Sequence, residues 1–227
     1  MNLLSGTMGV ICALNGEMGL AFVCMLLAAV FDFCDGLAAR LLKAYSPIGK
    51  ELDSLSDMVS FGVLPGLMLL KTMQLGGSPF LVACLPLFLV VMAALRLAKF
   101  NVDERQGSNF IGLPSPAAAL LAGALCTFIF CAPASLPTRW AGTPWFLPAV
   151  AVVLGLLMVS EIPMFGMKVA RGHKLLDTKR IVFLVLSLAA IVLTFVAGFH
   201  WSLAVLLPFC IYLLENLFLA AFGRRKG

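Results

Sequence analysis

The chain has 227 residues, of which 62% are hydrophobic and only 12% are charged. A soluble domain is about half apolar and about a quarter charged. This composition therefore excludes an ordinary soluble protein and predicts an all-α, polytopic membrane protein whose helices satisfy their own backbone hydrogen bonds. The formal net charge of +5 would suggest nucleic acid in a soluble protein, but orientation in a membrane explains it better, and we expect no nucleic-acid partner.

Eight continuous apolar segments follow one another, most of them about twenty residues long, the length that an α-helix needs to cross a bilayer. Ser46 and Pro47 suit the N-cap and first turn of the third helix. We see no repeat and no separate soluble region, so we predict one integral membrane domain over residues 1–227. The approximate bounds of the segments are 3–15, 19–43, 49–74, 80–102, 113–133, 145–168, 180–198 and 201–222.

The basic residues predict how these segments are oriented. If the N-terminus is cytoplasmic and the segments alternate in direction, 14 of the 16 Lys and Arg residues fall on the inner side, all except Lys71 and Arg139. The inner loops of membrane proteins carry such an excess of positive charge. We therefore expect a multi-pass protein with both ends in the cytoplasm.

The stretch FDFCDGLAARLLKAYSPIGKELDSLSD carries four aspartates inside this apolar chain. Asp32 and Asp35 are three residues apart near the end of the second segment. Asp53 and Asp57 are four apart near the start of the third, so each pair shares a helix face. Because the connection between the two segments is short, the helices are expected to be antiparallel neighbours. We predict that the four carboxylates meet between these helix ends, just below the membrane surface.

Four carboxylates this close repel one another, so a bound cation is needed to neutralise them. Ligands that are all oxygen favour a hard divalent ion such as Mg²⁺ or Mn²⁺, and four acids suit two ions. Arg40 follows Asp35 by five residues and is placed to meet a phosphate beside the metal. Gly36 keeps this helix face thin, so that a ligand can approach the backbone.

Two other interpretations compete with a metal site. The aspartates can be helix-end acids paired with Arg40, Lys43 and Lys50, but ionisable residues within membrane segments are usually functional. A cation transporter would place its acids near the membrane midplane on broken helices. Here the acids lie at helix ends beside an arginine, which favours a phosphate ligand over a transport pathway.

One motif runs through these residues: Asp32-x-x-Asp35-Gly36-x-x-Ala39-Arg40, eight further residues, then Gly49-x-x-x-Asp53-x-x-x-Asp57. The motif resembles the signature of the CDP-alcohol phosphotransferase family, with every fixed position present. The resemblance implies a six-helix catalytic core, here expected over residues 1–170, with two additional transmembrane helices over 171–227, and usually a homodimer. Members of the family use divalent metal to displace CMP from a CDP-linked lipid or alcohol with a second alcohol.

The resemblance also implies a role for each residue of the motif. Asp32, Asp35 and Asp53 would be metal ligands, and Asp57 would be a metal ligand or the general base for the attacking hydroxyl. Metals that bridge a diphosphate stabilise the charge on the leaving CMP, and a carboxylate can take the hydroxyl proton. The CDP moiety would lie along Asp32, Gly36, Ala39, Arg40 and Gly49.

Two further stretches concern the acceptor alcohol. LDSLSDMVSFG, residues 52–62, and LRLAKFNVDERQGSNFIGLPSPAAA, residues 95–119, resemble the bacterial branch of the family that uses serine. This implies transfer of the phosphatidyl group of CDP-diacylglycerol to L-serine, in the bacterial inner membrane, at an active site that faces the cytoplasm. Glycerol 3-phosphate or an inositol remains the alternative acceptor. A prenyltransferase also uses aspartate pairs and Mg²⁺, but the spacing of Gly36, Ala39, Arg40 and Gly49 speaks against it.

The remaining candidate residues lie farther along the chain. Arg96, Lys99 and Asn101 end the fourth segment on the inner side, where they are candidates for binding a lipid phosphate or the carboxylate of serine. The alternative for them is anchoring at the positive inner surface. Ser115 is expected to cap the fifth helix and is a tentative substrate contact. Glu161 is expected inside the sixth helix, with a structural role.

Overall fold

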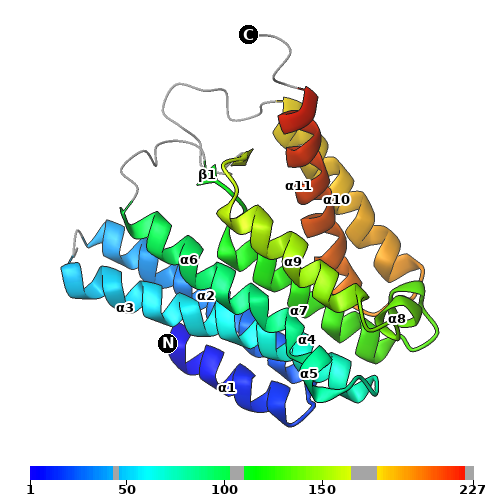
Figure 1. Cartoon of the computed structure of the whole chain (residues 1–227). Coiled ribbons are helices and arrows are strands. Elements are labelled where there is room, and N and C mark those ends of the chain that lie inside the picture. The colour runs from blue at the N-terminus through cyan, green and yellow to red at the C-terminus, as the bar shows by residue number, and fades with distance from the viewer. Residues whose placement is uncertain (43–45, 103–109, 165–177, 223–227) are drawn as a thin grey trace.

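The computed structural model of the protein describes residues 1–42, 46–102, 110–164 and 178–222. Most of these residues are helical (Figure 1). In chain order the elements are α1 (Asn2–Leu14), α2 (Met18–Leu41), α3 (Pro47–Asp57), η1 (Met58–Val63), α4 (Leu64–Leu75), α5 (Phe80–Ala83), η2 (Leu85–Leu87), α6 (Phe88–Val102), β1 (Phe110–Ile111), α7 (Ser115–Cys131), α8 (Leu136–Ala141), α9 (Phe146–Val159), β2 (Pro163–Met164), α10 (Thr178–Val196) and α11 (Ser202–Phe222).

Each predicted apolar segment contains a helix, and most ends agree to within a few residues. Three helical stretches are long and apolar enough to cross a membrane by length and composition, namely Met18–Ala39, Pro47–Leu75 and Phe80–Val102. Five shorter apolar helices accompany them in the described residues. The all-α prediction is therefore confirmed in its coarse form, and the chain is a multi-pass membrane protein. The predicted boundary between residues 170 and 171 lies outside the described residues.

The helical stretch Pro47–Leu75 begins and changes pitch for identifiable reasons. Ser46 is the N-cap of α3 and accepts a hydrogen bond from the N–H of Gly49 at 3.0 Å, and Pro47 lies in the first turn, as predicted. Farther along, Pro65 lacks the N–H that would bond four residues back, and its ring crowds that turn. The π-helical turn η1 ends at Val63, two residues before Pro65. Such wide turns are frequent at functional sites, and Asp57 directly precedes this one.

The core is built around α7, which packs against α2, α4 and α11. Its stretch AAALLAGAL is made of small and aliphatic residues, and nearly all of α7 is buried. Small residues let membrane helices approach closely. At Gly123 an added Cβ would lie 2.8 Å from the ring of Phe22 on α2. The close packing of α7 thus fixes α2, whose far end carries two of the aspartates.

One prediction fails at the end of the sixth segment. Helix α9 ends at Val159, and Ser160 is extended, so Glu161 lies outside the helix in which it was expected. Pro163 explains the early end, because the residue before a proline avoids the helical conformation. Instead Pro163–Met164 pairs antiparallel with Phe110–Ile111, a short β1–β2 ladder that the all-α prediction did not include. Residues 165–168 of the predicted segment lie outside the described residues.

The connection from β1 to α7 makes hydrogen bonds to backbone carbonyls at and just after the end of α9. The N–H of Gly112 donates to the carbonyl of Ile162, and the N–H of Leu113 donates to that of Leu157, both at 2.9 Å. Gly112 has φ +76°, and a Cβ there would lie 2.5 Å from the carbonyl oxygen of Met158. Only glycine fits this position without strain, and the connection delivers Ser115 to the start of α7.

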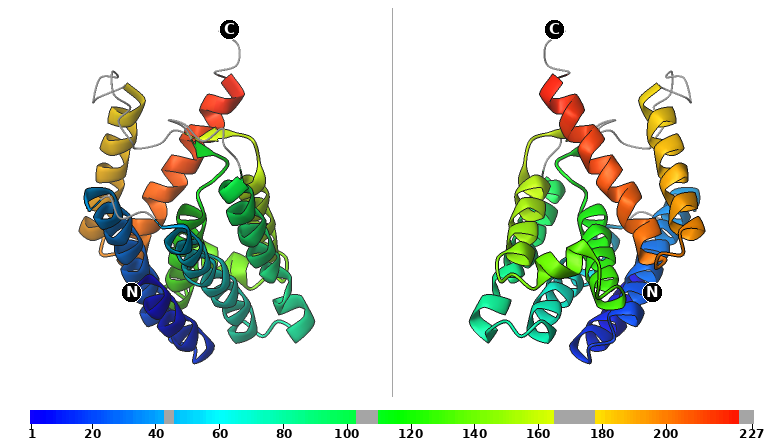
Figure 2. Two further views of the ribbon diagram at one scale, coloured as in Figure 1. Left: turned by 90° about the vertical axis from the view of Figure 1, so that its left-hand side faces the viewer. Right: turned by 90° about the vertical axis from the view of Figure 1, so that its right-hand side faces the viewer.

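The helix ends gather at two opposite sides of the molecule. The C-terminal ends of α2 and α6, the N-terminal end of α3 and the β1–β2 ladder share one side, and α5, α8 and the α1–α2 turn share the other (Figure 1). At one edge α11 packs against α7, and α10 packs on α11 (Figure 2). All the candidate aspartates therefore come from helix ends on a single side of the bundle.

Candidate active site

The aspartates of α2 and α3 form an acidic triad. One carboxylate oxygen from each of Asp32, Asp35 and Asp53 lies within 4.8 Å of the others. Asp32 is half-buried, whereas Asp35 and Asp53 are exposed. The triad forms because the antiparallel ends of α2 and α3 bring two helix faces together across a short connection, as their spacing predicts.

The triad fits a small divalent cation. Oxygen ligands of one Mg²⁺ lie at about 2.1 Å from the ion, and so roughly 3 to 4 Å from one another. A spread of up to 4.8 Å needs only small side-chain rotations to reach that geometry. An all-carboxylate set at a helix end is also the donor set that hard cations prefer.

Asp57 stands beside the triad and is not part of it. It lies one turn beyond Asp53, is half-buried, and is close enough to Asp32, Asp53 and Arg96 for their charges to act on it. Its Oδ1 accepts a hydrogen bond from the side-chain amide of Asn2 at 3.0 Å. The structure therefore brings three of the four predicted carboxylates together and gives the fourth a separate protein partner.

The glycines of the motif border open space. A Cβ added at Gly36 would have no heavy atom within 4 Å, and one at Gly49 would approach only the Ser46 hydroxyl, at 3.0 Å. Ala39 is half-buried. The protein leaves room next to α2 that no described side chain fills, and this room suits a ligand beside the triad. The side chain of Arg40 lies outside the described residues.

Arg96 is a buried cation behind the acidic region. Its side chain is 9% exposed, its Nη1 donates to the hydroxyl of Ser115 at 2.8 Å, and its guanidinium carbon lies 5.7 Å from the centre of the Phe100 ring. Among the described residues its buried Nε has no hydrogen-bond partner. A buried polar group without a partner is costly, so the Nε–H of Arg96 is a donor that a bound anion could accept from.

Ser115 occupies a different place from the one predicted. The N-cap of α7 is Pro114, which has no side-chain donor or acceptor, and Ser115 is the first helical residue. The prediction that Ser115 caps this helix is therefore wrong. Its hydroxyl is fully buried and accepts from Arg96, because the turn at Gly112 places the start of α7 against α6.

Lys99 and Asn101 make contacts between elements. Lys99 Nζ lies 3.7 Å from a carboxylate oxygen of Glu161, and both side chains are exposed. Asn101 donates to the hydroxyl of Ser54 at 2.9 Å, and Lys50 Nζ donates to the Asn101 carbonyl at 3.2 Å. These bonds tie the end of α6 to α3, the helix that carries Asp53.

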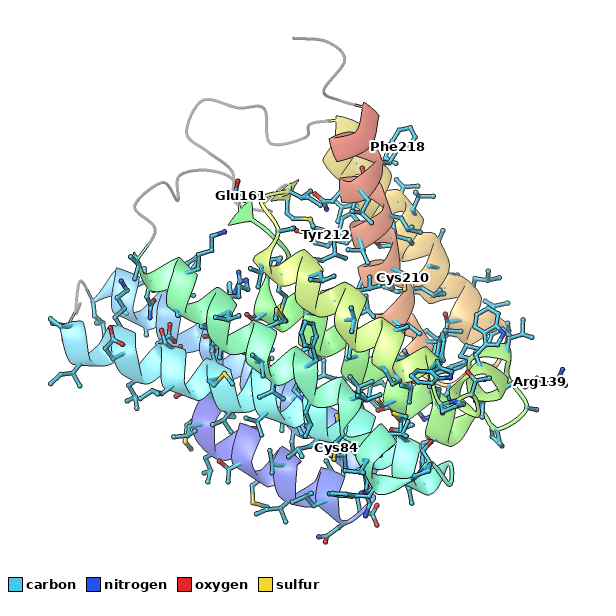
Figure 3. The ribbon with its side chains drawn as sticks, viewed as in Figure 1. Cys84, Arg139, Glu161, Cys210, Tyr212 and Phe218 are labelled. Atoms are coloured by element: carbon cyan, nitrogen blue, oxygen red, sulfur yellow. The ribbon has the colours of Figure 1, made fainter. Side chains whose placement is uncertain are left out.

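Two other residues near the site were not predicted from the sequence. Asn2, at the start of α1, contacts Asp57. Tyr212 of α11 is close enough to Arg96 for their charges to interact, and it extends from α11 toward β2, whereas Phe218 points away from the bundle (Figure 3). Neither residue belongs to the motif, and no spacing along the chain links either one to its partner.

The fold and the site describe a helical membrane protein with a cluster of carboxylates at one side of the bundle that could hold a divalent metal. The family model of the CDP-alcohol phosphatidyltransferases matches residues 1–159, and the chain belongs to this family. The CDP-diacylglycerol–serine O-phosphatidyltransferase of Bacillus subtilis is 44% identical over 89 residues, which cover 39% of this chain and 50% of that protein.

Two archaeal proteins are similar over longer stretches. The archaetidylserine synthase of Methanothermobacter thermautotrophicus is 35% identical over 128 residues, 53% of this chain and 52% of that protein. The CDP-diacylglycerol–serine O-phosphatidyltransferase of Methanocaldococcus jannaschii is 34% identical over 165 residues, 71% of this chain and 68% of that protein. The chain spans about half the length of the Bacillus and Methanothermobacter relatives.

Proposed function

We propose that the chain transfers the phosphatidyl group of CDP-diacylglycerol to the hydroxyl of L-serine, giving phosphatidylserine and CMP. The observation that carries the proposal is the convergence of Asp32, Asp35 and Asp53 beside Asp57, at the positions of the family's motif. Serine is supported as the acceptor by the names of two relatives, from a bacterium and an archaeon, and by the stretches around Asp57 and Arg96.

The acidic triad would hold the divalent metal, Mg²⁺ or Mn²⁺, as one ion or as two if Asp57 also contributes. Bound there, the metal would stabilise the charge that develops on the diphosphate as CMP leaves. Gly36, Ala39 and Gly49 would line the CDP moiety, since a Cβ at Gly36 would meet only open space. Arg40 would pair with a phosphate.

Asp57 would act as the general base. It would take the proton of the serine hydroxyl, the hydroxyl oxygen would bond to the phosphorus that carries diacylglycerol, and the bond from that phosphorus to CMP would break. We favour this direct displacement over a covalent enzyme intermediate, which requires an activated nucleophile. The nearby hydroxyls of Ser54 and Ser56 donate instead to the backbone carbonyls of Lys50 and Leu52.

Arg96 would bind the carboxylate of serine or the phosphate of the lipid. It is buried and positively charged, and its Nε has no partner among the described residues. Lys99 would add a second positive charge nearer the surface. Ser115 would hold the guanidinium in place, and Asn101 would hold the end of α6 against α3, through the hydrogen bonds that they make.

The protein would work in the bacterial inner membrane, with this site facing the cytoplasm. The distribution of Lys and Arg supports the orientation, and the family resemblance supports a homodimer. We also propose a six-helix catalytic core over residues 1–170 with two further helices over 171–227. The proximity of Tyr212 to Arg96 supports treating these helices as parts of one domain.

The test is CMP release by the purified protein from CDP-diacylglycerol with Mn²⁺ or Mg²⁺, with serine, glycerol 3-phosphate and inositol phosphate offered in separate reactions. We expect release with serine alone. Release only with another acceptor would overturn the serine assignment and keep the reaction class. No release with any acceptor from folded, metal-loaded protein would overturn the reaction itself, and uptake of metal into vesicles without CDP-lipid would then favour a transporter.

A further inference from the structure

We propose that Asn2 is a positioning residue for Asp57, and that Ser60 fixes the side chain of Asn2. This inference rests on the proposed role of Asp57 as the general base. Asn2 lies outside the aspartate motif and 55 residues from Asp57 in the sequence.

The contacts form a short chain of hydrogen bonds between α1 and the end of α3. The side-chain amide of Asn2 donates from Nδ2 to Oδ1 of Asp57 at 3.0 Å. The Ser60 hydroxyl donates to Oδ1 of Asn2 at 2.6 Å, and it also lies 3.3 Å from the Asn2 backbone carbonyl oxygen. Asn2 is 2% exposed and Ser60 is fully buried, so the hydrogen bond between these two residues is shielded from water.

The two partners determine which way the Asn2 amide points. A carboxylate only accepts hydrogen bonds, so the NH₂ group must face Asp57, and the amide oxygen then faces Ser60. The opposite orientation would direct the amide oxygen at the carboxylate oxygen, and the two would repel. The serine hydroxyl, which can donate, completes the preferred orientation.

The local backbone is shaped to allow this contact. Asp57 is the last residue of α3, and Ser60 lies in the π-helical turn η1. Both contact the first turn of α1. A Cβ added at Gly6 would lie 2.2 Å from the Ser60 hydroxyl oxygen and 3.0 Å from its Cα. Gly6 therefore lets η1 approach α1 closely enough for Ser60 to reach Asn2.

The consequence for Asp57 is a fixed carboxylate. The terminal torsion of an aspartate is broad, so a single carboxylate orientation requires a donor from outside. Asn2 provides it on Oδ1, and among the described residues no hydrogen bond reaches Oδ2. One oxygen is thus held while the other stays available to accept a proton from the acceptor hydroxyl.

The experiment compares Asn2→Ala, Ser60→Ala and Ser5→Ala in the full chain, purified in detergent with the tag at the C-terminus. Ser5 is the matched control, because it lies on the same helix and its hydroxyl donates to the Cys24 carbonyl on α2 at 2.8 Å, away from Asp57. CMP release gives kcat and KM, and Mn²⁺ titration of the substrate-free protein, followed by electron paramagnetic resonance, gives metal affinity.

We expect Asn2→Ala to lower kcat about 10- to 100-fold, the usual cost of losing a group that orients a catalytic one. KM and Mn²⁺ affinity should stay near the wild-type values, because the triad is not touched. Ser60→Ala should lower kcat by less, since Asn2 remains. An equal loss in Ser5→Ala, a fall in Mn²⁺ affinity parallel to that in kcat, or an unchanged kcat in Asn2→Ala would each overturn the inference.

A second measurement does not depend on turnover. Unfolding midpoints of Asn2→Ala, Asp57→Ala and the double variant form a double-mutant cycle, and we expect non-additive shifts. Additive shifts would contradict the contact itself. If the cycle shows coupling but the wild type releases no CMP with any acceptor, the contact is correct and the proposed function is wrong.

Discussion

The acidic triad and the buried Arg96 are two charged parts of the site, and they are built in opposite ways. The triad is largely exposed, carries three like charges, and comes from two helix ends that are close in sequence. Arg96 is buried, bears a single charge, and is paired with Ser115 on another helix. Under the proposed function, a bound cation would neutralise the triad, whereas the protein itself holds the arginine in place through Ser115.

The largest expected effect concerns the acidic region. Asp57→Asn should lower kcat about 10²- to 10⁴-fold, the usual contribution of a general base, while Mn²⁺ still binds to the triad. The measurement is CMP release together with Mn²⁺ titration of the same sample. Glu51→Gln, an exposed acid on the same helix, should leave both unchanged. A variant of Asp57 that retains wild-type kcat would remove this residue from the chemistry.

Arg96 provides the contrasting case. Arg96→Met should raise KM for serine or for CDP-diacylglycerol about 10- to 100-fold, the value of one hydrogen bond to a charged group. The substrate whose KM rises identifies the group that the guanidinium binds. Arg96→Lys should recover only part of the loss, because lysine lacks the planar fork of donors. An unchanged KM for both substrates would leave Arg96 with a purely structural role.

Substitutions at two glycines distinguish a position that the fold requires, Gly112, from a position that borders the proposed ligand site, Gly36. Gly112→Ala should destabilise the protein by about 1–3 kcal/mol, because alanine at positive φ is strained and its Cβ would meet the Met158 carbonyl. Gly36→Ala should leave the unfolding midpoint nearly unchanged and raise KM for CDP-diacylglycerol. Thermal unfolding in detergent and CMP-release kinetics measure the two effects, and a reversal of this pattern would contradict the assignment of open space at Gly36 to a ligand.

The smallest effect is expected at Lys99. Its ion pair with Glu161 is exposed, and such pairs contribute about 0–1 kcal/mol. Lys99→Gln should therefore change the unfolding midpoint little and raise KM by at most about fivefold, much less than Arg96→Met. A larger effect on KM at Lys99 than at Arg96 would show that the acceptor's charge binds near the surface, not at the buried guanidinium.

Much of the fold follows from the sequence because local rules determine it. Apolar runs set the helices, Ser46 and Pro47 set the start of α3, and the spacing of the aspartates sets their shared faces. The end of α9 was predicted too late, because the apolar run continues past Pro163, whereas the helical conformation of the backbone cannot continue up to this proline. Hydropathy gave no sign of the β1–β2 ladder, whose strands are two residues each.

The partners of the catalytic candidates could not be predicted in the same way. The pairs Asn2–Asp57 and Arg96–Ser115 join residues 55 and 19 positions apart, and no periodicity connects them. Four-residue spacing places Asp57 on the same face as Asp53, and in the structure it lies close to Asp53 and Asp32. The spacing could not predict its hydrogen bond to α1, which depends on Asn2, Ser60 and the tight approach at Gly6.

The central claim is that the acidic triad is where metal-dependent chemistry takes place. The most direct measurement is a Mn²⁺ titration of wild type and Asp53→Asn in which bound metal and CMP release from CDP-diacylglycerol are followed in the same samples. The account predicts that binding and turnover rise together in the wild type and that both are lost in Asp53→Asn, with Glu51→Gln behaving as wild type. Wild-type binding and turnover in Asp53→Asn would contradict it.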